Sequence, residues 1–210
     1  PLDIVRMSDG NLLVSESAGN RLSLLDKKGH FIKHIGCRGR DVGQMVGPQY
    51  IALDSMDRIF VTDIGNRRVD VFDKDGNGLF FFGNKTSNFE GLKYPTGIAI
   101  NRDSVYVADE STGCIYEFDL SGNFIQNLVE KDTFKKPEAL KIWQDSIILC
   151  DENKIISVDL DSGSCFEYAR TGNAPSRVTT AVADVNNNII VTDYKSNEIY
   201  VMSRIKELVG

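Results

Sequence analysis

The chain has 210 residues, a formal net charge of −6, and 41% hydrophobic and 26% charged residues. This is the composition of an ordinary soluble globular protein, long enough for one well-buried domain or for several small repeating units. No apolar run approaches the roughly 20 residues that cross a bilayer, so we expect no membrane span. The acidic balance disfavours nucleic acid as a partner, because domains that neutralise phosphates are usually basic.

A unit of about 42 to 47 residues recurs along the chain. Acidic residues that follow a short apolar run keep step with a series of prolines, and two independent series in step make accident improbable. The acids are Glu16, Asp63, Asp109, Asp151 and Asp193, and the prolines are Pro1, Pro48, Pro95, Pro137 and Pro175. The chain is therefore one domain of five repeats, approximately at residues 1–47, 48–94, 95–136, 137–174 and 175–210.

Taken in chain order, each unit has the pattern of short antiparallel strands. The first contains "LLVSESAGNRLSLLDKKG", and the second contains "YIALD", "RIFVTD", "RVDVFD" and "LFFFG", separated by turns at "SMD", "IGN" and "KDG". The third contains "VYVADESTGCIYEFDLSG", the fourth has a shorter turn, and the fifth contains "IIVTDYKSNEIYVMSR". Apolar runs bounded by Gly, Asn or Asp are typical of a β-meander, and no unit has sustained helical spacing.

Four antiparallel strands in a unit of this size predict one blade of a β-propeller. A lone blade buries too little apolar surface, whereas stacking blades around an axis covers both faces of each sheet. This arrangement explains the consecutive apolar residues in "IFV", "IAI" and "FFF". We therefore predict an all-β fold, a β-propeller built of four-stranded antiparallel blades.

The second unit resembles the NHL repeat almost throughout residues 48–83, and the third resembles it well over residues 95–122. The shared pattern is a proline followed by I-A, a strand ending in V-T-D or V-A-D, and N-R-x-V-x-V-F-D before a closing F-G. The other units are looser, since Glu16 replaces the aspartate and the fourth unit lacks the Asn-Arg pair. The resemblance implies a segment of a six-bladed propeller within a longer multi-domain chain. A closed five-bladed ring is the alternative.

The recurring acids could form a ring of metal ligands or could cap tight turns. We expect turn caps, because an Asp at a strand end accepts backbone N–H groups and a structural role predicts repetition in every blade. The four cysteines, Cys37, Cys114, Cys150 and Cys165, have no CxxC spacing, which disfavours zinc. We expect buried thiols, with a Cys150–Cys165 bridge as the alternative.

Catalytic chemistry has little support in the sequence. The two histidines, His30 and His34, share one predicted outer strand and have no partner from a second blade. A calcium-dependent hydrolase or lyase of the gluconolactonase type would hold the ion with carboxylates and amides at the axis. The residues expected to enter the innermost strands are Gln49, Thr96, Glu138 and Ser176, with a single carboxylate. We therefore predict no enzyme, no metal and no cofactor, with Ca²⁺ as the alternative.

Inter-blade connections and the turns between second and third strands share one end of a propeller, here named the loop face. Its expected cations are Arg21, Arg38, Arg40, Arg67, Arg68, Lys85, Lys93, Lys135, Lys136, Arg170 and Arg177, and aspartates collect at the opposite end. Arginine and aromatic residues are favoured in binding patches. The predicted partner-binding residues are Arg38, Arg40, Met45, Tyr50, Arg67, Lys85, Phe89, Lys93 and Tyr94.

These observations predict a non-catalytic NHL-type platform or scaffold that binds a protein or peptide partner through its inter-blade loops. Two alternatives stay open: the calcium-dependent hydrolase or lyase, and RNA binding by the loop face. Fold alone does not determine function. The choice of the platform therefore rests in part on the resemblance to the NHL repeat.

Overall fold

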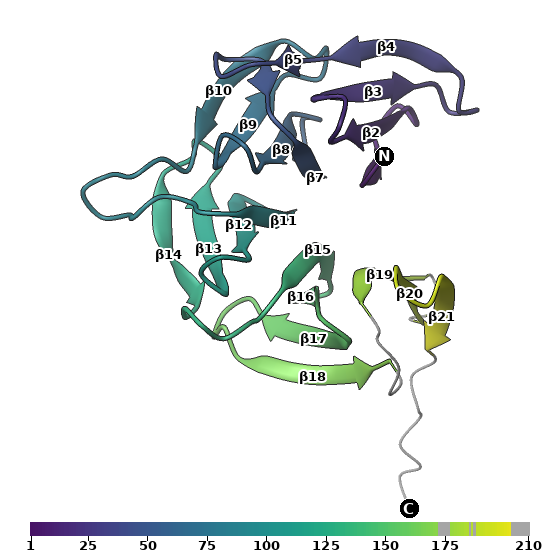
Figure 1. Cartoon of the computed structure of the whole chain (residues 1–210), viewed down its shortest axis with the longest axis vertical. Helices are drawn as coiled ribbons and strands as arrows, with labels where there is room; N and C mark the ends of the chain where they lie inside the picture. The colour runs from purple at the N-terminus through teal and green to yellow at the C-terminus, as the bar shows by residue number, and fades with distance from the viewer. Residues whose placement is uncertain (172–176, 185, 187, 203–210) are drawn as a thin grey trace, which may run out of the picture.

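The structure is a computed structural model that describes residues 1–171, 177–184, 186 and 188–202. The described residues form strands and turns with no helix, so none of them forms a helix that could cross a membrane. Figure 1 shows the sheets arranged around a central axis. The fold is a β-propeller, as the repeats predict.

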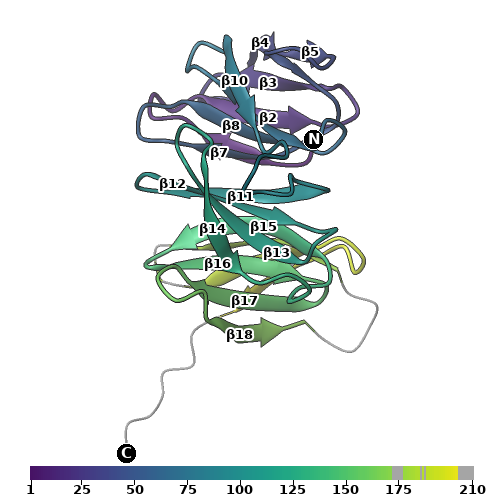
Figure 2. The same cartoon turned by 90° about the vertical axis from the view of Figure 1, so that its left-hand side faces the viewer.

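The sheets follow the repeats in chain order, and Figure 2 shows them stacked along the molecule. Blade 1 contains β1 (Ile4–Arg6), β2 (Leu12–Glu16), β3 (Arg21–Leu25) and β4 (Phe31–Ile35). Blade 2 contains β7 (Pro48–Leu53), β8 (Ile59–Asp63), β9 (Arg68–Phe72) and β10 (Gly78–Phe82). Blade 3 contains β11 (Pro95–Asn101), β12 (Ser104–Asp109), β13 (Cys114–Asp119) and β14 (Phe124–Val129).

Blade 4 contains β15 (Pro137–Trp143), β16 (Ser146–Asp151), β17 (Lys154–Asp159) and β18 (Cys165–Arg170). In blade 5 the described residues form β19 (Val178–Ala183), β20 (Ile189–Asp193) and β21 (Glu198–Met202). A short parallel pair, β5 (Cys37–Arg38) and β6 (Gln44–Met45), lies in the connection from blade 1 to blade 2.

Burial follows the position of a strand in its blade. The first strand of each blade lies nearest the axis, and β4, β10, β14 and β18 lie at the outside (Figure 1). The middle strands β8 and β9 are buried at every position, because neighbouring blades cover both faces of the sheet. The outer strand β4 is exposed except at Ile35. This explains why the middle strands lack the polar and apolar alternation of a half-exposed sheet.

The register corrects one part of the predicted alignment. Asp63 pairs with Pro48, and the aspartates of the next two blades pair with their prolines in the same way. In blade 5 the residue opposite Asp193 is Val178, not the predicted Pro175. The innermost position is therefore occupied by Thr179 rather than Ser176, because β19 begins at Val178, three residues after the proline. Pro175 and Ser176 lie outside the described residues.

Buried apolar layers join each blade to the next. Representative pairs within the four layers are Leu22 with Val61, Phe60 with Phe118, Ile115 with Leu149, and Ile155 with Val191. One layer contains a group of aromatic rings, in which Phe89 of the connection into blade 3 stacks on Phe124 with 4.7 Å between centroids. These layers are the core of the protein.

The described parts of blades 1 and 5 leave one sheet face each uncovered. Ile199 in β21 is 69% exposed, whereas Ile115 at the same register position in β13 is fully buried. Ile4 in β1 is 56% exposed, whereas Ile51 at the same position in β7 is 1% exposed. Figure 1 shows blades 1 and 5 on the two sides of the opening. Blade 5 does not cover blade 1 as a closed five-bladed ring would require, and a six-bladed ring stays a prediction.

Candidate functional site

The predicted turn caps are confirmed for Asp63, Asp109 and Asp193, which accept hydrogen bonds from backbone N–H groups of the turns that follow them, at 3.2, 3.1 and 3.2 Å. The aspartates also hold the segment that precedes each blade. Asp63 accepts a hydrogen bond from the backbone N–H of Val46 at 3.0 Å, and Asp109 accepts one from Tyr94 at 2.9 Å. Asp151 and Asp193 do the same for Lys136 and Arg177, at 2.6 and 3.0 Å. Each aspartate thus fastens the chain segment that enters its own blade. These acids serve the backbone and are not a shared ligand set.

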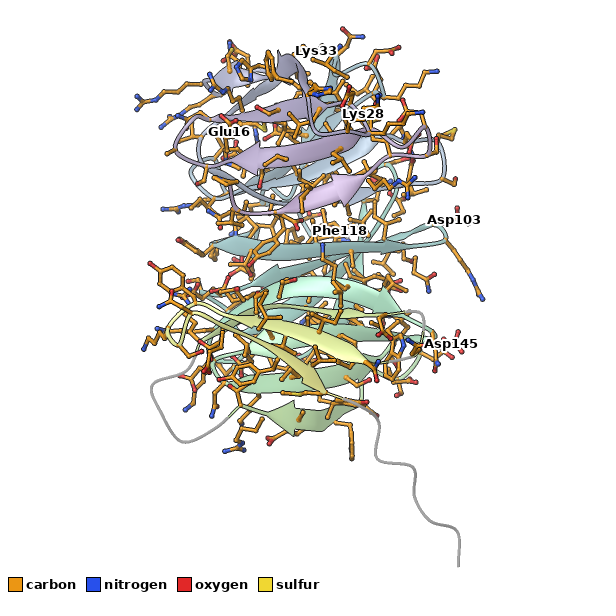
Figure 3. All side chains as sticks on the ribbon, turned by 90° about the vertical axis from the view of Figure 1, so that its right-hand side faces the viewer. Glu16, Lys28, Lys33, Asp103, Phe118 and Asp145 are labelled. Carbon is orange, nitrogen blue, oxygen red and sulfur yellow. The ribbon has the colours of Figure 1, made fainter. Side chains whose placement is uncertain are left out.

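Glu16 departs from this pattern in the first blade. Its carboxylate accepts hydrogen bonds from Ser23 Oγ at 2.6 Å and Arg21 Nε at 2.8 Å. These two hydrogen bonds lower the pKa of Glu16 below its usual range. Figure 3 shows Glu16 at one end of the propeller and Asp103 and Asp145 at the other, as the predicted division into two faces requires.

Charged and polar side chains from three blades meet at the axis. Tyr50 of β7 donates a hydrogen bond from its hydroxyl to Glu138 Oε2 of β15 at 3.0 Å. Arg177, which precedes β19, pairs with Glu138 Oε1 through its Nε at 3.0 Å. Burial and the nearby Glu138 carboxylate raise the pKa of Tyr50, so its hydroxyl keeps its proton. The polar groups of this cluster are therefore engaged with one another.

A cavity of about 800 Å³ lies beside this cluster and is lined by blades 1, 2, 4 and 5. Its lining includes Leu2, Ile4, Val14, Tyr50, Glu138 and Arg177. Ile4 and Val14 belong to the uncovered side of blade 1, so the cavity is continuous with the opening in the ring. Its shape depends on what covers that opening.

The other residues considered for axial chemistry have structural partners. Gln49 Nε2 donates to Ser17 Oγ at 3.3 Å, and Thr96 Oγ1 donates to the Pro137 carbonyl at 2.7 Å. Within residues 1–171, 177–184, 186 and 188–202, no group of three or more His, Cys, Asp or Glu side chains is placed to hold a metal ion. His34 lies in the exposed outer strand β4, and His30 directly precedes this strand. β4 is the strand of blade 1 that lies farthest from the axis.

The structure divides the predicted partner-binding residues into two groups. Arg38, Arg40, Arg67, Lys85, Lys93 and Tyr94 are exposed. Met45, Tyr50 and Phe89 are buried, with 0%, 4% and 6% exposure, and their prediction as partner contacts is wrong. Met45 packs between blades 1 and 2, Tyr50 reaches the axis, and Phe89 packs between blades 2 and 3. Met45 and Phe89 thus fill the layers below their connections rather than the surface.

Arg68 was predicted to share the exposed cationic face, and the structure buries it to 4% exposure. Its guanidinium donates to the carbonyls of Arg40 at 2.7 Å and Gln44 at 2.8 Å. It also pairs with Asp70 at 2.8 Å and lies 3.9 Å from the centroid of the Phe81 ring. Arg68 therefore holds the connection between blades 1 and 2 against blade 2.

Asp70, its buried partner, was not singled out by the sequence. Burial raises its pKa to about 8, opposed by the Arg68 charge and supported by the neighbouring Asp63. The sequence feature that could have identified Asp70 is an acidic residue in the centre of an apolar strand, "RVDVF". A charge at such a position needs a buried partner.

The four thiols are free. Cys114 and Cys150 are buried as expected, and burial raises the pKa of Cys114 to about 12. Cys37 and Cys165 are exposed, so the expectation of buried thiols is wrong for these two, which lie in a connection and an outer strand. The alternative Cys150–Cys165 bridge is absent from the structure, whose β16 and β18 are separated by β17.

The geometry defines a β-propeller with a polar, loop-rich end. No family model matches the chain. The chain is 29% identical over 124 residues to the E3 ubiquitin-protein ligase NHLRC1 of Rattus norvegicus, a match that covers 58% of the chain and 29% of the relative. It is 28% identical over 184 residues to the NHLRC1 of Homo sapiens, a match that covers 80% of the chain and 46% of the relative. It is also 28% identical over 119 residues to Protein brain tumor of Drosophila melanogaster, covering 55% and 11%.

These relatives are NHL-repeat proteins, and the chain that resembles them has a β-propeller fold. The chain spans less than half the length of the curated relatives it matches.

Solved structures share the fold, among them two that are 18% identical to this chain. One is a nidogen/laminin complex, with a TM-score of 0.77 over 93% of this chain and 72% of the other. The second is virginiamycin B lyase from Staphylococcus aureus, with a TM-score of 0.72 over 95% of this chain and 64% of the lyase chain. A fold shared by a lyase and by a component of a protein complex is compatible with catalysis and with binding.

Proposed function

We propose that this propeller is a non-catalytic platform that binds a protein or peptide partner on its loop face. The observation that carries the proposal is a set of exposed cations with no ion-pair partner among the described residues: Arg38, Arg40, Arg67 and Lys93. Tyr94 adds an aromatic ring that is 42% exposed. Exposed arginine and tyrosine side chains are enriched in protein interfaces.

The loop face is held rigid, which favours binding because little conformational freedom is lost. The Asp caps fasten the incoming connections, and Lys93 Nζ donates to the carbonyl of Glu90 at 2.8 Å within its own loop. The names of the sequence relatives agree with this proposal, since an E3 ubiquitin-protein ligase acts on other proteins. The charged groups at the axis, in contrast, are occupied by one another.

The experiment compares charge reversals on the two faces, four on the loop face and three on the opposite face. Arg38, Arg40, Lys85 and Lys93 are changed to Glu in one variant, and Lys28, Lys74 and Arg102 near the opposite turns are changed in the control. Candidate partners captured with the wild-type protein are purified, and their Kd values are measured for all three proteins. We expect the loop-face variant to lose at least tenfold in affinity and the control to stay within twofold. Binding that survives the loop-face reversal would overturn the proposal.

A further inference from the structure

A hollow of about 470 Å³ opens on the loop face where the connection from blade 1 meets blade 2. Arg40, Asn66, Arg67, Arg68, Phe81 and Asn84 line it. Three of these side chains are arginines, in a chain whose net charge is −6. The hollow therefore concentrates positive charge on an otherwise acidic protein.

The base of the hollow is fixed by buried contacts. Arg68 lies against the ring of Phe81 and donates to three carbonyls of the connection, those of Arg40, Asp41 and Gln44. Asn66 Nδ2 donates to the Gly39 carbonyl at 2.9 Å. Because both segments are tied together, the backbones that carry Arg40 and Arg67 keep a fixed separation.

The two exposed arginines of the hollow, Arg40 and Arg67, lack the ion-pair partners that Arg21 and Lys85 on the same face have. Arg21 pairs with Glu16 at 2.8 Å, and Lys85 pairs with Glu90 at 3.4 Å. Arg40 and Arg67 are exposed and have no carboxylate within ion-pair distance anywhere in the described part of the chain. Their guanidinium groups are free to meet a carboxylate from outside, and arginine does so through two parallel N–H donors.

The backbone of Arg67 has a conformation that is uncommon for arginine. Arg67 has a φ of 58°, in the left-handed region that disfavours side chains with a Cβ. The same turn position holds Asn20, Gly113 and Asn197 in three other blades. Asn and Gly adopt this conformation more readily than arginine. The second blade therefore has an arginine where the turn favours a smaller residue.

From this geometry we propose that the hollow binds carboxylates of an acidic peptide segment, with Arg40 and Arg67 as the anion-binding side chains. This inference rests on the proposed function and names the chemistry of the partner. A nucleic acid fits the hollow less well, because strands of bases need open aromatic surfaces for stacking. The aromatic ring here, Phe81, is covered by the Arg68 guanidinium.

The test measures fluorescence anisotropy with three labelled probes of about ten residues: a Glu/Asp-rich peptide, its Gln/Asn counterpart, and oligouridine. We expect the acidic peptide to bind and the amide peptide to bind at least tenfold more weakly. Affinity should fall as NaCl is raised, because exposed charges are screened. Reversal of both arginines, R40E/R67E, should cost at least tenfold and create binding to a Lys-rich peptide.

The matched control is R102E, since Arg102 is exposed and has a similar φ of 54° at a different turn. It should leave acidic-peptide affinity within twofold. Equal binding of the acidic peptide to wild-type and R40E/R67E proteins would overturn the proposal, as would tighter binding of oligouridine.

A second variant, K85E/K93E, separates this inference from the platform itself. If a captured partner is lost with K85E/K93E but retained with R40E/R67E, the platform stands and the hollow is not its contact. If both variants and the full loop-face reversal retain the partner, the platform fails as well.

Discussion

Lys141 of β15 and Asp3 near the start of the chain form an ion pair of 3.3 Å across the axis, although 138 positions separate them. Asp3 also accepts a hydrogen bond from the backbone N–H of Ile51 at 3.0 Å. One carboxylate thus connects blades 1, 2 and 4. Its side chain is 8% exposed, so the charge depends on these partners.

We therefore expect Lys141→Met to lower the free energy of unfolding by about 1–3 kcal/mol, because it leaves the Asp3 charge with reduced compensation. The reference is Lys154→Met, which removes a half-buried partner of Glu167 at 3.8 Å and should cost less than about 0.5 kcal/mol. Urea unfolding measures both. Equal effects of the two substitutions would show that the axial pair has no special role in stability.

A substitution at Phe89 tests whether this side chain belongs to the core rather than to a partner-binding surface. Its ring is buried and packs on Phe124, so Phe89→Ala should cost about 3 kcal/mol of unfolding free energy through the cavity it leaves. Tyr94→Ala in the same connection should cost less than about 1 kcal/mol, since the ring is 42% exposed. Denaturant midpoints give the comparison. A larger loss at Tyr94 would contradict the assigned packing.

Asp70 makes stability depend on pH. Its pKa is 3.8 as an unperturbed group and about 8 in the fold. Between these values the folded protein retains a proton that the unfolded chain has released, so stability should fall as pH rises through this window. The slope is at most about 1.4 kcal/mol per pH unit.

Asp70→Asn is neutral at every pH and should remove this contribution. Urea midpoints of both proteins at pH 6, 7 and 8 give the difference. The wild-type midpoint should fall relative to the variant as pH increases, whereas a constant difference would show that Asp70 does not titrate there.

The strained turn predicts a variant that is more stable than the wild type. Arg67→Gly removes the cost of a Cβ in the left-handed region, although it also gives the unfolded chain more freedom. We expect a net gain of about 0.5 kcal/mol, together with weaker binding of the acidic peptide. Arg102→Gly should give a similar gain without changing binding. Thermal unfolding measures the stability of each variant, and fluorescence anisotropy measures its affinity for the acidic peptide. Loss of peptide binding in both variants would refute the assignment of carboxylate binding to Arg67.

The uncovered faces can be probed with substitutions at one register position. Ile199→Glu should change the free energy of unfolding by less than about 0.5 kcal/mol, because the side chain is already 69% exposed. Val69→Glu, at the equivalent fully buried position, should prevent folding. A large destabilisation by Ile199→Glu would show that this face is covered in solution.

If a sixth blade completes the ring, as the resemblance to the NHL repeat implies, the faces bearing Ile4 and Ile199 are its contacts. Self-association of the 210-residue chain, measured by light scattering, should then fall when Ile199 is charged. Unchanged self-association in this variant would exclude the face as its cause.

The fold could be predicted from the sequence because turn residues and prolines recur in step. Asp63 and Pro48 mark the same point of a blade because they pair directly in the sheet. Pro175 was misleading, since the pairing of Asp193 with Val178 depends on a backbone contact that proline spacing does not report.

The site was less predictable. Charge and position identified Arg40 and Arg67 as surface residues, and that is where they lie. The same reasoning failed for Met45 and Phe89, because composition does not tell which side of a connection packs inward. The burial of Arg68 depends on carbonyls more than twenty residues earlier in the chain, contacts that only the folded structure brings together.

The caps formed by Asp63, Asp109 and Asp151 have a consequence for how such a protein can change over time. Each carboxylate secures the segment that leads into its own repeat, with no help from the repeat that follows. Because Val46, Tyr94 and Lys136 close the preceding repeats, each of these hydrogen bonds joins two neighbouring repeats through one aspartate of the second. The loops between repeats can then diverge into different recognition surfaces while the strands beneath them stay in register.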